Sequence, residues 1–146
     1  MSIKILKIIH AALVLGLLVF AAAAYFSGEG FVTQFTFEGD FYMYLIPSIA
    51  VLAYFGSQVL FQQELSKIDK STTVKQKFAK YQAASILKFA LIEGAALLAL
   101  FQFMSTRYSL YFTIAICLIV YLAFQNPTKN KLIQDLDLRS DEQKEV

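Results

Sequence analysis

The sequence predicts an all-α integral membrane protein, a four-helix bundle with both termini in the cytoplasm. Three observations lead to this fold class. Apolar side chains make up 58% of the 146 residues and charged side chains only 16%, whereas a typical soluble domain is about 45–50% apolar and about 25% charged. The charges are clustered, and the uncharged runs between them are long enough to cross a bilayer. The basic residues fall almost entirely on one side of these runs, as the positive-inside rule requires.

Four apolar runs make up a single transmembrane domain. They cover approximately residues 8–26, 41–61, 83–104 and 109–125. The first run follows two lysines and contains four consecutive alanines before its last two residues, so a cleaved signal peptide over residues 1–26 is the alternative to a retained helix. In the second run, Pro47 is compatible with a kinked membrane helix. Very few residues join the last two runs, which predicts adjacent antiparallel helices.

The segments between the runs differ in character. Residues 27–40 are acidic and contain alternating Phe side chains, which predict an extended loop that rests on the helix ends or forms a lid over an external opening. Residues 62–82 are polar and basic with helix-like apolar spacing. We expect there a cytoplasmic helical hairpin extension, with Ser71 or Thr72 as the cap of its second helix. Residues 126–146 form a cytoplasmic tail, in which a short amphipathic helix is expected on the inner membrane surface.

The basic residues indicate the orientation in the membrane. Twelve of the thirteen Lys and Arg residues fall on the side of the two termini, and only Arg107 falls on the other side. This distribution places both termini and the 62–82 extension in the cytoplasm. The lipid bilayer is therefore the first expected partner. The net charge of +2 is small and no separate basic domain is present, which argues against nucleic-acid binding.

Glu93 is the main candidate for a functional residue, because it lies near the middle of the third apolar run. An ionisable group at that depth costs roughly 2.5–3.5 kcal/mol on insertion scales. A low-dielectric medium favours the neutral carboxyl, so Glu93 could be protonated and exchange a proton, or bind Na⁺. Ala90 and Gly94 lie beside it. Small residues of this kind let another helix approach closely, or leave room for a water molecule or an ion.

Five polar residues are candidates to accompany Glu93. The structural alternative is that a protonated Glu93 is tied to another span through Gln58, Ser48 or Thr113. Lys88 is five residues away in the sequence, or about 140° around the helix, so it does not face Glu93 and is expected to snorkel to the cytoplasmic headgroups. His10 lies at a similar depth on the first run. There it either contacts the base of the third run or lies among the headgroups without a function.

The sequence contains no motif for enzymatic chemistry. It has no nucleophile–base arrangement, no Gly-rich phosphate loop and no cluster with metal-ligand spacing. The single cysteine, Cys117, rules out an internal disulfide and argues against a thiolate metal site. We therefore expect no enzyme activity, no metal, and no cofactor apart from H⁺ or Na⁺ at Glu93.

The stretch Lys88-Phe-Ala-Leu-Ile-Glu-Gly-Ala-Ala-Leu-Leu-Ala-Leu100 resembles the carboxylate-bearing helix of the rotary ATPase proteolipids, the c and K subunits. That resemblance implies that Glu93 binds a proton or sodium ion that is carried through an oligomeric ring. It is confined to the third run, and residues 41–61 contain only one glycine where that family has a regular glycine pattern. The chain as a whole also resembles small uncharacterised four-span membrane proteins of bacteria. This second resemblance implies the bacterial inner membrane and supplies no activity.

Three functions follow from these observations as alternatives. The first is a small membrane protein, proteolipid-like or otherwise ion-coupled, in which Glu93 binds H⁺ or Na⁺ within a homo-oligomer. The second is a structural or accessory subunit whose small-residue helix faces bind another membrane protein. The third is a small multidrug exporter that works as a dimer and also uses one membrane Glu. The lack of Trp and the position of Glu93 on the third run argue against the exporter.

Overall fold

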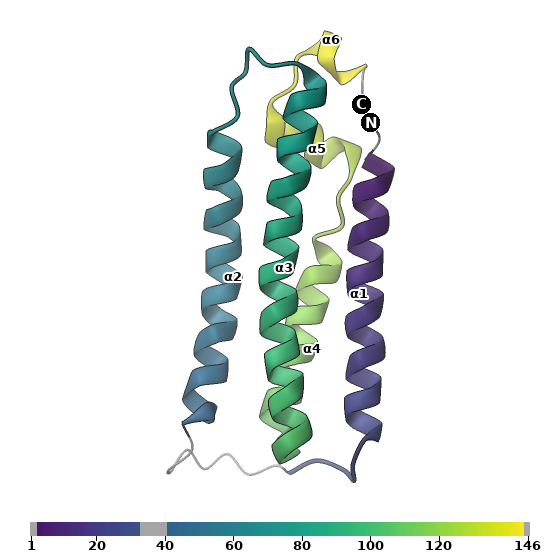
Figure 1. The fold of residues 1–146 in the computed structure, drawn as a ribbon, viewed down its shortest axis with the longest axis vertical. Helices are drawn as coiled ribbons and strands as arrows, with labels where there is room; N and C mark the ends of the chain where they lie inside the picture. Colours follow the sequence, from purple (N-terminus) through teal and green to yellow (C-terminus); the bar gives the residue numbers. More distant parts are fainter. Residues whose placement is uncertain (1–2, 33–40, 145–146) are drawn as a thin grey trace.

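The fold is an all-α bundle, as the sequence predicts. A computed structural model describes residues 3–32 and 41–144. Within these residues, four long helices run side by side and two short helices cover one end (Figure 1). The helices are α1 (Ile3–Phe26), α2 (Tyr42–Ser66), α3 (Val74–Thr106), α4 (Ser109–Phe124), α5 (Lys129–Leu136) and α6 (Ser140–Gln143). Both described ends of the chain and the α2–α3 connection lie at the same end of the bundle, which we call the basic end.

Three of the described helices are long and apolar enough to cross a membrane: α1, α2 and α3. Helix α4 has 16 residues, which corresponds to about 24 Å and is shorter than a bilayer core of about 30 Å. It becomes a fourth candidate span only together with α5, which continues it after a bend of 82°. The described residues therefore contain three to four candidate spans. Pro47 lies inside α2 without ending it.

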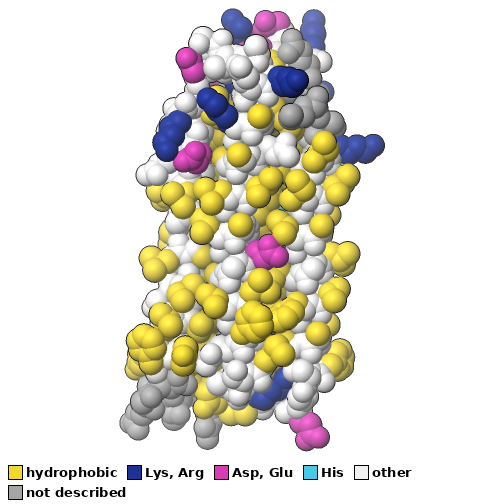
Figure 2. Space-filling model, in the orientation of Figure 1, with side chains coloured by type: hydrophobic (Ala, Val, Ile, Leu, Met, Phe, Trp, Pro, Cys, Tyr) yellow, Lys and Arg dark blue, Asp and Glu magenta, His cyan; other side chains and the backbone are white. Residues whose placement is uncertain are grey.

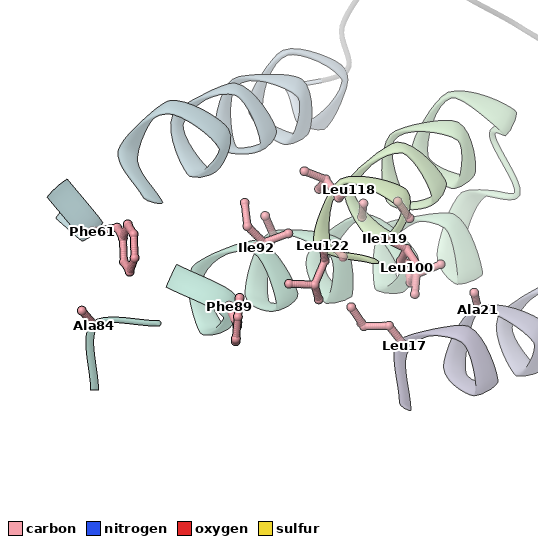
Figure 3. Close-up of a cluster of buried hydrophobic side chains, with 14 of the residues drawn as sticks. Leu17, Ala21, Phe61, Ala84, Phe89, Ile92, Leu100, Leu118, Ile119 and Leu122 are labelled. Atoms are coloured by element: carbon pink, nitrogen blue, oxygen red, sulfur yellow. The ribbon is translucent and has the colours of Figure 1, made fainter. Parts of the chain in front are cut away.

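Helix α3 is the centre of the bundle. It packs against α1, α2 and α4, and the hydrophobic core contains side chains from all four helices (Figure 3). Phe89 and Ile92 of α3 are almost completely buried there, together with Leu122 of α4. In Figure 1, α1 and α2 lie on opposite sides of α3, and α4 lies behind it. The side of α3 that is turned away from α4 is therefore left uncovered by the described helices.

The α2–α3 connection joins two helices that run on toward the basic end. Helix α2 continues to Ser66 and α3 begins at Val74, so both helices extend well past the predicted apolar runs. The cap differs from the expected one. Thr73 is the N-cap of α3: its side chain accepts a hydrogen bond from the Gln76 backbone, and the Gln76 side chain accepts one from the Thr73 backbone. Of Ser71, Thr72 and Thr73, only Thr73 has a Gln three residues later, which is what this reciprocal capping box requires.

The tail differs from the expected membrane-surface helix. Helix α5 packs on the end of the bundle, and its Leu132 is completely buried. Leu138, which follows α5, is almost completely buried. An ion pair holds the following α6: Lys77 Nζ lies 2.8 Å from Glu142 Oε2, and both side chains are buried. The apolar face of the tail is therefore covered by protein instead of by lipid headgroups.

Arg107 stabilises the opposite end of the bundle. It follows α3 in the left-handed conformation, with φ of 60°. Its guanidinium donates hydrogen bonds of 2.7 Å to the carbonyl groups of both Ala24 and Tyr25 at the end of α1, and one of 3.1 Å to Gly30. The last carbonyl groups of a helix have no partner within the helix, so the one basic residue at this end caps α1.

Part of the predicted lid lies outside the described residues. Residues 33–40, which carry most of the alternating pattern, belong to this part. Phe31, which is described, rests its ring 5.7 Å from that of Phe103 and 5.5 Å from that of Phe112. This contact agrees with a loop that packs its aromatic side chains on the helix ends.

Candidate functional site

The uncovered side of α3 forms a continuous exposed stripe, which we call the open face. Its exposed residues recur at intervals of three and four: Ala83, Leu87, Ala90, Gly94, Leu98 and Phe101. On the α2 side, Ala90 and Gly94 line a shallow groove of about 390 Å³ together with Ala53 and Gly56 of α2. The predicted small-residue surface therefore exists, and it faces outward from the chain.

Glu93 lies at the opposite edge of the open face. Its side chain is half-buried, and it is the only acidic residue of α3. Figure 2 shows one acidic side chain at mid-height on this side of the molecule, surrounded by hydrophobic and uncharged groups, whereas the other charges gather toward the two ends. A carboxyl group in this position borders the hydrocarbon of the bilayer if α3 spans it.

Within residues 3–32 and 41–144, Glu93 has no hydrogen bond and no ion pair. The three polar side chains that were expected to tie it down have other partners. Ser48 donates a hydrogen bond of 2.6 Å to the Tyr44 carbonyl in its own helix. Gln58 donates a hydrogen bond of 2.8 Å to the Tyr121 hydroxyl, and Thr113 donates one of 2.8 Å to the Ser109 carbonyl in its own helix. The structure therefore pairs Glu93 with none of these side chains. Ala90 and Gly94 are its neighbours along α3, and they line the groove on the other edge of the open face.

The small residues near Glu93 are not explained by packing inside the chain. A Cβ atom added at Gly94 or at Gly56 would meet no atom within 4 Å, apart from the helix itself. Both positions therefore have open space in front of them. Space of this kind is what a further helix needs for close approach in a membrane.

Lys88 lies on another side of α3 and points into a cavity between helices. Its ammonium group lies 3.9 Å from the centre of the Phe61 ring and 5.5 Å from that of Phe89. The expected separation from Glu93 around the helix agrees with this position. The sequence predicts that the Lys88 side chain extends to the headgroups. In the structure, its ammonium group lies over aromatic rings in a cavity of about 430 Å³.

His10 ties α1 to the bundle. Its side chain is 5% exposed, and its Nε2 donates a hydrogen bond of 2.6 Å to the Leu122 carbonyl near the end of α4. Its ring also meets that of Phe89 edge-on, with 5.0 Å between the ring centres. Of the two alternatives for His10, contact with the third run is the one seen, through Phe89. Its buried carbonyl partner makes a structural role sufficient to explain it.

Two polar pairs at the basic end were not predicted. Lys77 pairs with Glu142, and this hydrogen bond, together with those from Arg139, lowers the pKa of the Glu142 carboxyl to about 2. Tyr81 donates a hydrogen bond of 3.0 Å to Asp135, and burial together with this carboxylate raises the Tyr81 pKa. A signal existed for Lys77, because it follows Val74 by three residues and precedes Tyr81 by four, which places it on the same helix face as these two apolar positions.

The arrangement presents one carboxyl group midway along α3 that has no ion-pair partner among the described residues. Among the described side chains, no group of three or more His, Cys, Asp and Glu could hold a metal ion. Glu93 stands without a basic neighbour on its face, so a bound proton is the simplest way to keep it uncharged inside a bilayer.

Comparison with known proteins adds no relative. No protein-family model matches the chain, and neither curated proteins nor solved structures give a match. The resemblance to the proteolipid helix therefore depends on the residues around Glu93 alone. The chain is established as a small all-α protein with three to four candidate membrane spans.

Proposed function

We propose that this protein is a small integral membrane protein that binds a proton reversibly at Glu93. A single observation carries the proposal: a half-buried carboxyl midway along α3, without a hydrogen bond or ion pair to any described residue. An uncompensated carboxylate at mid-membrane costs roughly 2.5–3.5 kcal/mol. Binding of a proton removes this cost by neutralising the carboxylate, and a bound Na⁺ ion would also balance its charge.

A second copy of the chain completes the site in this proposal. A protonated carboxyl is both a donor and an acceptor of hydrogen bonds, so it is complementary to the same group on another copy. Two copies related by a two-fold axis would bring identical open faces together. The exposed stripe with Ala90 and Gly94 provides the close approach that such a contact needs.

Labelling with dicyclohexylcarbodiimide tests the proposal, because this apolar reagent reacts with protonated carboxyl groups in apolar surroundings. We expect the adduct on Glu93 in proteoliposomes at neutral pH, and slower labelling at high pH. Na⁺ slows the labelling if it competes with the proton. Glu93→Gln is the control that must abolish the adduct. If the wild-type protein is not labelled at Glu93 while it remains folded in the membrane, the proposal is wrong.

A second candidate function is an accessory subunit that binds a different membrane protein. The observation that favours it is the α2–α3 groove, whose glycines at positions 56 and 94 have open space in front of them. The size of the complex extracted in mild detergent separates the two candidates. A homo-oligomer agrees with proton binding between copies, whereas a complex with a stoichiometric second protein agrees with the accessory role.

A further inference from the structure

A second candidate site lies on a different side of α3 from Glu93. It is the cavity of about 430 Å³ between α2, α3, α4 and α5, toward the basic end. Lys88 and the buried Ser85 of α3 line it, and Lys131 and Asp135 of α5 line its exposed side. Lys88 is about 140° around the helix from Glu93, so the two sites do not share a face.

The Lys88 ammonium group has unused hydrogen-bonding capacity. The groups in direct contact with it are the faces of two aromatic rings, Phe61 at 3.9 Å and Phe89 at 5.5 Å, while Asp135 and Lys131 act on its charge from a longer distance. No carboxylate of the described residues lies within ion-pair distance of it. An ammonium group carries three donor hydrogens, and ring faces attract the charge without accepting these hydrogens as oxygen atoms do. The cavity therefore presents a cation that still needs an oxygen acceptor.

The other charged groups of the cavity are already engaged. Lys131 Nζ donates a hydrogen bond of 3.0 Å to the Asn126 carbonyl, and Asp135 accepts one of 3.0 Å from the Tyr81 hydroxyl. Two lysines and one aspartate leave the cavity lining with one excess positive charge. The lining therefore favours an anion over a cation.

Tyr121 supplies a neutral donor in the same cavity. Its hydroxyl oxygen accepts a hydrogen bond of 2.8 Å from Gln58 Nε2. This bond holds the phenol in place and leaves its own hydrogen available, and no described residue accepts it. The cavity thus combines one unpaired ammonium with one oriented hydroxyl donor.

We propose that this cavity binds the phosphate group of an anionic ligand, with Lys88 and Tyr121 as its donors. Phosphate oxygens accept several hydrogen bonds, and a lysine binds phosphate as a point charge. The cavity volume falls within the range of about 300–1,000 Å³ that is usual for small-ligand sites. The phosphate can come from the headgroup of an anionic phospholipid or from a soluble phosphate compound, because both present the same oxygens.

Binding of phosphatidylglycerol, compared with phosphatidylcholine, to the full-length protein in detergent micelles tests this proposal by native mass spectrometry. We expect the wild-type protein to prefer phosphatidylglycerol, and Lys88→Met to bind it about tenfold more weakly. Lys75→Met is the matched control, because Lys75 is exposed on the same helix outside the cavity. Its binding should equal that of the wild-type protein.

Inorganic phosphate distinguishes the two sources. Competition by phosphate at millimolar concentration supports a soluble ligand, and binding of phosphatidylglycerol that resists phosphate supports a lipid headgroup. Tyr121→Phe keeps the ring and removes only the hydroxyl donor. If Lys88→Met does not fold, weaker binding of the probe by Tyr121→Phe supports the proposal, and unchanged binding contradicts it. The proposal is overturned if the wild-type protein binds neither probe, or if every folded variant binds as the wild-type protein does.

Discussion

Replacement of Arg107 by Met should destabilise the bundle, because this side chain caps α1. Its two hydrogen bonds of 2.7 Å join the ends of α1 and α3. A hydrogen bond from a charged group contributes about 1.5–3 kcal/mol. Arg107 is only half-buried, so water replaces part of this stabilisation. We expect the free energy of unfolding to fall by about 2–3 kcal/mol in total, or roughly 5–10 °C in Tm.

Thermal unfolding in detergent, followed by helical circular dichroism, measures this change. Arg107→Lys keeps the charge and loses the fork that reaches two carbonyl groups, so its loss should be about half as large. Lys67→Met is the control, since the Lys67–Glu64 pair of 3.1 Å is exposed and contributes about 0–1 kcal/mol. If Arg107→Met unfolds at the temperature of this control, the cap does not stabilise the bundle as argued.

Two further predictions concern the tail and the open face. Since Lys77 and Arg139 lower the Glu142 pKa from 4.5 to about 2, the tail contact is complete above about pH 4.5 and is lost as the pH falls toward about 2. The protection factors of the α5 and α6 amides, which correct hydrogen exchange for its intrinsic pH dependence, should therefore fall over this window, and Glu142→Gln should show low protection at every pH. Gly94→Leu should abolish self-association, measured by analytical ultracentrifugation, while the monomer keeps its Tm because nothing lies within 4 Å of a Cβ there. A leucine variant that still self-associates would exclude Gly94 from the interface.

The long helices were predictable because apolar runs in a membrane protein leave few alternatives. A backbone in hydrocarbon must satisfy its own hydrogen bonds, so the run around Glu93 could only be a helix. The boundaries at the basic end were harder to predict. There α3 begins at Val74, because its N-cap Thr73 and Gln76 exchange hydrogen bonds. This pairing is visible in the sequence once the two positions are compared.

The tail and the partners of the polar residues could not be predicted from local pattern. Whether Leu132 faces lipid or protein depends on how the chain turns after α4, and that bend of 82° is a tertiary feature. The pairing of Gln58 with Tyr121 likewise joins residues 63 positions apart. The sequence did place Glu93 and Lys88 on different faces, because helical periodicity alone determines that relation.

The most direct test of the account is the protonation state of Glu93 in the membrane. Infrared difference spectroscopy of proteoliposomes detects the C=O stretch of a protonated carboxyl, and the difference between wild type and Glu93→Gln assigns the band. The account predicts a band at neutral pH that diminishes as the pH rises toward about 9 or as Na⁺ is added. A spectrum that lacks this band, or one that does not change between about pH 5 and about pH 9 and ignores Na⁺, would contradict reversible proton binding at Glu93.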